Sequence, residues 1–206
     1  MLFRSTANIT VRTLTITGTF TASNKVYDGT TAANGNVSVP ASPGLSGVQA
    51  SDDVTLAGSP VFTFSQATVG SNLTITTSGY SLSGTTAGNY ALTQPTYTAS
   101  ITTRTVTIGG SLVVASTKTY DSTTTISITD AAQLTLVNVP AADAGSPAKI
   151  SLTSLVAQYA SKTVGTGKSV SLTGAAITGT TSSNYTLSMT GAPTTTADIS
   201  SRSEEH

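Results

Sequence analysis

Apolar and polar residues alternate along many short segments of the chain. Thr13–Thr17, Leu73–Thr76 and Val170–Thr173 place Leu, Ile or Val at every second position, with Thr or Ser between them. Successive side chains of a strand point to opposite faces, so this period of two predicts strands with one apolar and one hydroxyl-rich face. Clusters of Gly, Asn, Ser and Pro separate the segments, and convincing helical periodicity is missing. The pattern predicts an all-β fold.

The same blocks of sequence recur in the same order. Their offsets lie between 92 and 98 residues, which is within the usual size of a domain. The recurring blocks are Ala7–Arg12, Ala99–Arg104 and Ala197–Arg202; Lys25–Thr31 and Lys118–Thr124; Thr68–Gly70 and Thr163–Gly165; and Gly84–Tyr90 and Gly179–Tyr185. They predict two domains, at residues 9–104 and 105–202.

The joins between repeats are short. Each repeat closes with Ile-Thr-x-Arg or Ile-Ser-x-Arg, and no Pro- or Gly-rich linker follows, which predicts a stiff connection. Several short strands with turns between them, in a unit of this size, favour an immunoglobulin-like sandwich. The predicted fold is therefore two tandem immunoglobulin-like antiparallel β-sandwich domains in an extended arrangement, with neighbouring repeats of the same chain as partners.

Composition narrows the classes of function. The chain has 43 Thr and 29 Ser among 206 residues, no Cys and a formal net charge of zero, and its only Glu and His residues lie in the tail 203–206. Catalysis needs acid–base, metal-binding or activated nucleophilic side chains that this chain hardly has, so no enzyme is expected. Nine basic residues spread along the chain predict no nucleic-acid binding, and no apolar run is long enough for a membrane helix. We interpret 203–206 as a remnant of an expression tag, and residues 1–4 lead into no signal-peptide-like apolar segment.

Four segments of the first repeat carry a recognisable motif. They are Lys25–Thr31, Gly47–Leu56, Gly88–Leu92 and the closing Ile101–Arg104. These segments resemble the YDG repeats of filamentous-haemagglutinin-like bacterial surface proteins. The resemblance implies a secreted or cell-surface adhesin of a Gram-negative bacterium, with tandem domains forming a stalk. The second repeat departs from the motif, since Ser122 replaces the glycine and Asp143 alone stands for the Asp pair.

Repeated tyrosines and a pair of carboxylates are candidate binding residues. Tyr27 matches Tyr120, and Tyr90 matches Tyr185, so each pair would either stack on a carbohydrate or anchor a core that has no Trp, with its hydroxyl on a backbone group. Core anchoring is the favoured interpretation. Asp52-Asp53 is the only pair of adjacent Asp residues and the weak candidate for calcium, which needs about six to eight oxygen ligands. No other cofactor is expected.

A Lys, an Asp and an Asn recur together in both repeats. They are Lys25, Asp28 and Asn89 in the first repeat and Lys118, Asp121 and Asn184 in the second. Surface adhesin domains can fuse such a Lys and Asn into an isopeptide bond beside a buried carboxylate, and this chemistry needs a neutral, desolvated amine. The alternative is an ordinary Lys–Asp surface pair with an Asn in a turn. We favour that alternative.

Three functions are therefore carried forward. The leading hypothesis is a non-catalytic stalk that projects a distal binding region from the cell and whose neutral faces favour lateral association in biofilm. The second is a module that binds a glycan or a host protein directly, through loops 40–53 and 130–149. The third is a self-crosslinking adhesin domain.

Overall fold

The computed structural model describes residues 8–145 and 147–203. Secondary structure in these residues consists of strands and three short 3-10 helices, so the predicted all-β fold is confirmed. No helix in this part of the chain is long and apolar enough to cross a membrane. Residues 1–4 and 204–206, on which two of the sequence interpretations rest, lie outside the described residues.

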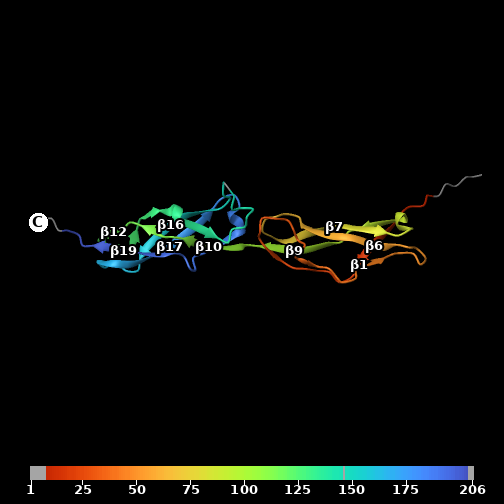
Figure 1. Cartoon of the computed structure of the whole chain (residues 1–206), viewed down its shortest axis with the longest axis horizontal. Coiled ribbons are helices and arrows are strands. Elements are labelled where there is room, and N and C mark those ends of the chain that lie inside the picture. Colours follow the sequence, from red (N-terminus) through yellow and green to blue (C-terminus); the bar gives the residue numbers. More distant parts are fainter. Residues whose placement is uncertain (1–7, 146, 204–206) are drawn as a thin grey trace, which may run out of the picture. The chain divides into compact units, whose positions relative to one another are not determined.

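The chain divides into two compact units (Figure 1). The first contains the described residues up to Val26 together with Thr30–Thr102. The second contains Tyr27–Gly29 and the described residues from Thr103 onward. The three residues Tyr27–Gly29 come from the first sequence repeat but belong to the second compact unit, which sequence periodicity does not indicate.

The first unit holds two sheets of three and four strands and a two-stranded ribbon. The sheet orders are β5-β1-β8, β3-β9-β7-β6 and β2-β4. Its elements are β1 (Arg12–Thr17), β2 (Thr21–Ala22), β3 (Lys25–Val26), β4 (Val37–Ser38), β5 (Gly44–Ser46), β6 (Thr55–Phe64), β7 (Gly70–Ser83), the 3-10 helix η1 (Ala87–Asn89), β8 (Tyr90–Thr93) and β9 (Thr96–Thr102).

The second unit repeats this plan with sheets of three and five strands and a two-stranded ribbon. The sheet orders are β15-β10-β18, β12-β19-β17-β16-β13 and β11-β14. Its elements are β10 (Arg104–Gly110), β11 (Val113–Val114), β12 (Thr117–Thr119), β13 (Thr125–Ile126), β14 (Ile128–Asp130), η2 (Ala131–Gln133), β15 (Leu134–Val137), β16 (Ser151–Tyr159), β17 (Gly165–Thr178), η3 (Ser182–Asn184), β18 (Tyr185–Ser188) and β19 (Thr194–Ser200).

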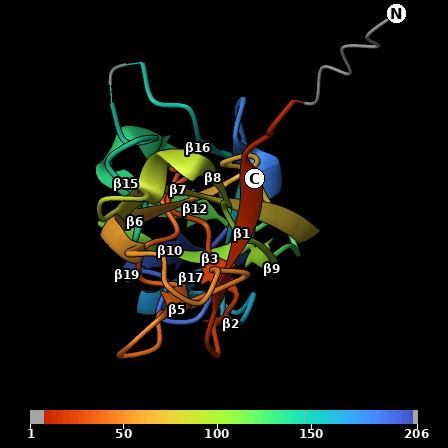
Figure 2. The same ribbon diagram turned by 90° about the vertical axis from the view of Figure 1, so that its right-hand side faces the viewer.

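Four strand pairs run parallel, so the prediction of wholly antiparallel sheets is wrong for them. The pairs are β1 with β8 and β3 with β9 in the first unit, and β10 with β18 and β12 with β19 in the second. Figure 2 shows β1 beside β8, where Arg12 pairs with Tyr90. Parallel neighbours need a long connection, and most of a repeat separates each pair here. Local alternation cannot reveal that direction.

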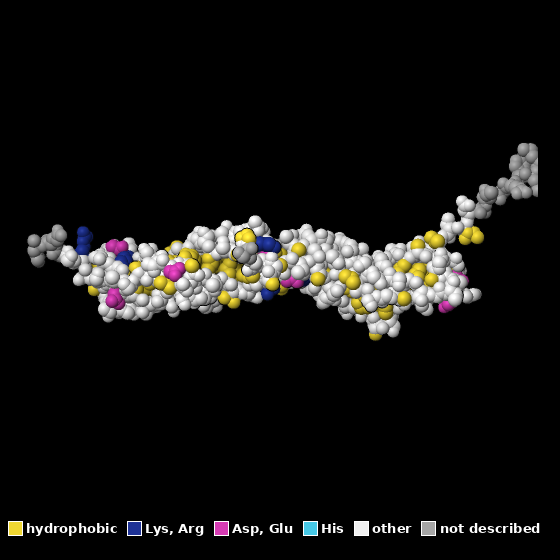
Figure 3. Space-filling view, turned by 45° about the horizontal axis from the view of Figure 1, so that its top comes forward, with side chains coloured by type: hydrophobic (Ala, Val, Ile, Leu, Met, Phe, Trp, Pro, Cys, Tyr) yellow, Lys and Arg dark blue, Asp and Glu magenta, His cyan; other side chains and the backbone are white. Residues whose placement is uncertain are grey.

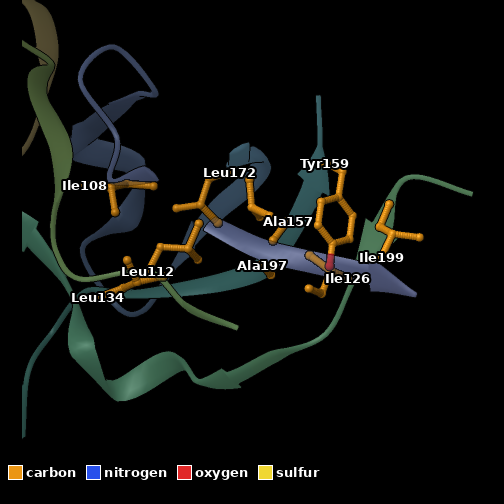
Figure 4. Packing of buried hydrophobic residues seen from close by; sticks show 10 residues of the cluster. Ile108, Leu112, Ile126, Leu134, Ala157, Tyr159, Leu172, Ala197 and Ile199 are labelled. Atoms are coloured by element: carbon orange, nitrogen blue, oxygen red, sulfur yellow. The ribbon is translucent and has the colours of Figure 1, made fainter. Parts of the chain in front are cut away.

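The alternating segments face the core as their pattern predicts. In β1, Leu14 is buried while Thr13 and Thr15 are exposed, and in β10 Val106 and Ile108 are buried. Ten buried residues, nine from the two larger sheets of the second unit and Leu112 from the turn after β10, form one core (Figure 4). They are Ile108, Leu112, Ile126, Leu134, Ala157, Tyr159, Val170, Leu172, Ala197 and Ile199. Each large apolar side chain buried in this way stabilises the unit by about 1.5–3 kcal/mol before the entropy cost of folding.

Candidate functional site

Asp143 is a buried carboxylate in the loop between β15 and β16. Its side chain is 1% exposed, and its N–H donates to the Pro140 carbonyl at 2.9 Å. The hydroxyls of Tyr185 and Tyr27 both donate to its Oδ2, at 2.6 and 2.9 Å. The Lys149 ammonium lies 3.5 Å from Oδ1. A buried carboxylate needs this many partners, because an uncompensated one would be strongly destabilising.

The two tyrosines reach Asp143 from different parts of the chain. Tyr185 is the first residue of β18 and follows η3, while Tyr27 follows β3. Their rings meet edge to face, with centroids 5.3 Å apart. The side chain of Asn184, the last residue of η3, hydrogen-bonds the Tyr27 hydroxyl and is itself buried. Asp143, Tyr185 and Asn184 therefore form a polar cluster, which we call the acceptor cluster, around the Tyr27 hydroxyl.

The surroundings of the cluster favour protonated tyrosine hydroxyls and an ionised Asp143. Burial, together with the hydrogen bond to Asp143, raises the pKa of Tyr27 to about 12, and the same causes raise the pKa of Tyr185. Burial also raises the pKa of Asp143, but hydrogen bonds from Tyr185, Tyr27 and Thr181 and the Lys149 charge outweigh it, so this pKa lies below its usual value. The tyrosines stay donors and the carboxylate stays an acceptor near neutral pH. The arrangement is suited to holding a segment of chain.

The backbone of Tyr27–Gly29 is also held by contacts within the second unit. Arg104 donates from one guanidinium nitrogen to the Tyr27 carbonyl at 3.2 Å and from two others to Asn138 at 2.7 and 2.8 Å. Gly29 has a φ of +78°, and a Cβ there would lie 2.5 Å from the Ala142 Cβ. A side chain at this position would clash with the loop before Asp143, which explains the glycine of the motif physically.

The first unit has part of this arrangement around Asp52. The Tyr90 hydroxyl donates to Asp52, accepts the Gln49 N–H at 3.1 Å, and Asp52 N–H donates to the Gln49 carbonyl at 3.1 Å. Tyr90 is buried, as Tyr185 is, but Asp52 is only half-buried and Asn89 is exposed. The tyrosine hydroxyls thus bind carboxylates, where sequence reasoning favoured a backbone acceptor. In both units the carboxylate binds the tyrosine at the start of a strand, Tyr90 in β8 or Tyr185 in β18. That tyrosine pairs with an arginine of the neighbouring parallel strand, Arg12 in β1 or Arg104 in β10.

The calcium candidates Asp52 and Asp53 bind different partners. Asp53 accepts the Thr85 N–H at 2.9 Å and the Thr85 hydroxyl at 3.1 Å, and these hydrogen bonds lower the pKa of its carboxyl. Asp52 is engaged by Tyr90. Among residues 8–145 and 147–203, no group of three or more His, Cys, Asp or Glu side chains is placed to hold a metal ion.

Lys25 and Lys118 close equivalent loops. The Lys25 ammonium donates to the carbonyl and hydroxyl of Thr30 and to the Ala32 carbonyl, at 2.8–3.0 Å, and lies 5.8 Å from the Phe64 ring centroid. The Lys118 ammonium donates to Thr123 and Thr125 in the same way. Each Lys thereby holds the loop that follows its own Tyr-Asp-Gly or Tyr-Asp-Ser segment.

The remaining isopeptide candidates take other roles in the described hydrogen bonds. Asp121 lies 2.7 Å from the Lys118 ammonium and accepts the Thr123 N–H, and these contacts lower the pKa of its carboxyl to about 2. Asp28 lies in the Tyr27–Gly29 segment, and Asn89 and Asn184 end η1 and η3. The structure brings Lys118 and Asp121 together, and it places the Asn184 side chain at Tyr27.

We expect the intact mass of the chain to equal the mass of its sequence. The side-chain nitrogens of Lys25 and Lys118 each donate to three oxygens of their own loop, whereas isopeptide formation needs a neutral amine directed at an Asn side chain. Each isopeptide bond would expel one ammonia, which denaturing mass spectrometry resolves. A mass deficit of one or two ammonia that disappears in the Lys25→Arg and Lys118→Arg variants would instead establish the cross-link.

Sequence reasoning missed Asp143 and Arg104 as functional residues. A usable signal was present, since Asp143 follows Asp52 at nearly the repeat offset and both tyrosine pairs recur at theirs. The signal was weak because the second repeat has an insertion at this point. The Asp53 carbonyl accepts the Thr86 N–H in the first unit, and the Lys149 carbonyl accepts the Thr181 N–H in the second. Asp53 directly follows Asp52, whereas five residues separate Asp143 from Lys149.

The chain is therefore an all-β protein built from tandem repeats, with a buried Tyr–Asp cluster in its second unit. Comparison with protein families gives this class of protein its name. The model of the YDG domain matches residues 9–99 and again residues 102–196, so the chain belongs to the YDG domain family. No curated protein and no solved structure matches the chain significantly.

Proposed function

We propose that the chain is a pair of non-catalytic structural repeats from the stalk of a secreted, filamentous-haemagglutinin-like bacterial surface adhesin. In this proposal each repeat is an immunoglobulin-like sandwich, and its partners are the neighbouring repeats of the same chain. One observation carries the proposal. A segment of the first sequence repeat, Tyr27–Gly29, belongs to the compact unit that the second repeat forms. A domain that takes a segment from another repeat is suited to use in tandem.

The surface supports a passive role. Figure 3 shows a face with few charged side chains, most of it covered by backbone and uncharged polar groups. The chain as a whole has nine basic and nine acidic residues and a net charge of zero. Such a surface offers little long-range attraction to polyelectrolytes, and it gives little repulsion between neighbouring filaments. Both properties suit a spacer.

The proposal is tested at the cell surface and in solution. An antibody raised against the 206-residue chain should label intact cells of the source bacterium without permeabilisation, and deleting the parent gene is the control. On arrays of glycans and matrix proteins, the same chain should bind no better than an unrelated β-protein. Label confined to permeabilised cells would refute the surface assignment. The predicted binding loops, 40–53 and 130–149, contain β5, η2 and β15. Specific binding that is lost when their exposed side chains, other than those of these elements and of Asp52 and Asp143, are replaced by Ser would favour the direct-binding alternative.

A further inference from the structure

The second unit shows what a Tyr-Asp-Gly segment does when a YDG domain receives it. Tyr27 is 3% exposed there, donates to Asp143, and has its carbonyl held by Arg104. The receiving residues are the acceptor cluster defined above. The equivalents of both partners exist elsewhere in the chain, because each repeat carries its own Tyr-Asp segment and its own acceptor cluster.

The equivalent segment of the second repeat lies on an exposed surface and shares the positive φ of its third residue. Tyr120 is 37% exposed, and Ser122 has a φ of +68°, close to that of Gly29 although serine rarely adopts it. Lys118 holds the loop after the segment just as Lys25 does. A surface hollow of about 520 Å³ is lined by residues 119–122 together with Arg202, the repeat equivalent of Arg104. The segment therefore shares with Tyr27–Gly29 the positive φ of its third residue and the lysine that holds the following loop.

The equivalent cluster of the first repeat presents matching acceptors. Asp52 is half-buried and binds Tyr90, as Asp143 binds Tyr185. Asn89 is exposed at the position where buried Asn184 hydrogen-bonds Tyr27. Arg12 lies beside Gly47, the repeat equivalent of Asn138, with 3.9 Å between its Nε and a Cβ built on that glycine. Carboxylate, amide and guanidinium groups thus occupy the same positions as those that hold Tyr27.

We infer that Tyr120–Ser122 and the Asp52–Tyr90–Asn89 cluster are the two halves of a head-to-tail contact with further YDG domains. The Tyr120 hydroxyl donates to Asp52 of the domain that follows, and Arg202 holds the Tyr120 carbonyl. The partner is a YDG domain, since the ligand of the cluster is a Tyr-Asp turn. Ser122 carries a side chain where Gly29 has none, and the loop that it meets differs from the loop before Asp143, because Ser51 has a φ of +139°. The inference rests on the tandem-repeat part of the proposed function and is independent of the assignment to a surface adhesin.

The test joins two copies in register. Residues 1–202 are followed directly by residues 13–206, so that Arg202 takes the place of Arg12 in the downstream copy. Both the joined chain and the 206-residue chain are treated with a tyrosine-nitrating reagent, and each site is quantified by peptide mass spectrometry. Nitration of the upstream Tyr120 should be several-fold slower in the joined chain. Tyr27, buried in both chains, is the internal control and should be protected equally.

Two variants of the joined chain separate the contact from general stabilisation. Asp52→Asn in the downstream copy should restore nitration of the upstream Tyr120, whereas Asp53→Asn, which changes the neighbouring carboxylate, should leave it protected. Circular dichroism reports whether each variant is folded. Equal nitration of Tyr120 in the joined and the 206-residue chains would overturn the inference, whether or not the antibody labels the cell surface. A mixture of separate chains at high concentration shows whether the same protection also arises between molecules.

Discussion

Replacing Asp143 with alanine is expected to lower the free energy of unfolding of the second unit by about 3 kcal/mol or more. The side chain is almost fully buried and accepts from two tyrosine hydroxyls, so its loss leaves both donors, and the Lys149 charge, without their acceptor. Urea denaturation of the full chain, followed by circular dichroism, measures the change. Asp130→Ala is the matched control, because Asp130 caps the short helix η2 and accepts the Gln133 side-chain amide without lying in the buried cluster, so its loss should cost about 1 kcal/mol. Equal effects of the two variants would contradict the prediction.

Acidification should also lower the free energy of unfolding of the second unit, because it protonates Asp143. The pKa of Asp143 in the folded chain lies below the ordinary value of 3.8 for an Asp carboxyl, so its contribution to stability is fully present above that value. The contribution is lost as the pH falls through the lower, folded pKa. Urea midpoints measured between neutral pH and acid should therefore fall in the acid range for the unchanged chain. The urea midpoint of the Asp143→Asn variant should fall less over the same pH range. If it falls as much as that of the unchanged chain, other carboxylates cause the acid sensitivity.

Replacing Phe64 with alanine is expected to destabilise the first unit by about 3–5 kcal/mol. Phe64 is 2% exposed near the end of β6, its N–H donates to the Thr31 carbonyl at 2.8 Å, and its ring packs beneath the Lys25 ammonium. Removing the ring leaves a cavity and takes away the support of the loop that Lys25 closes. Urea denaturation measures the loss, and Phe64→Leu should recover part of it, because leucine refills some of the volume.

The matched control for Phe64 lies on the same strand. Val61 is 47% exposed, so Val61→Ala should change the free energy of unfolding by about 0.5 kcal/mol or less. A Phe64→Ala variant no less stable than Val61→Ala would show that the first unit has no tightly packed core at β6.

The strands were predictable from sequence because their information is local. Thr13–Thr17 alternates in sequence, and its burial in β1 follows that alternation. Sequence repetition likewise predicted two copies of one domain, and the YDG domain model matches twice. The parallel pairing of β1 with β8 was not predictable, since alternation specifies the face of a strand and leaves its neighbour and direction open.

The candidate site was predictable only in part, because its partners are distant in sequence. Tyr27 and Tyr185 were recognisable as repeated aromatics, but Tyr27 reaches Asp143 across 116 residues and Tyr185 reaches it across 42. The repeat offset would suggest that Tyr27 serves its own repeat, as Tyr90 does. The role of Asp143 depends on which compact unit receives Tyr27, and a period in the sequence does not contain that information.

The assignment of Tyr27–Gly29 to the second compact unit has a consequence for recombination. A crossover between two repeat copies at the same position within the repeat removes or adds one whole repeat, and the new junction again places a Tyr-Asp segment before an acceptor cluster like that of Asp143. A crossover between different positions separates a Tyr-Asp segment from its acceptor and leaves a buried carboxylate with one donor fewer. The contact between Tyr27 and Asp143 therefore favours variation in length by whole repeats, and it disfavours changes that separate a Tyr-Asp segment from its acceptor.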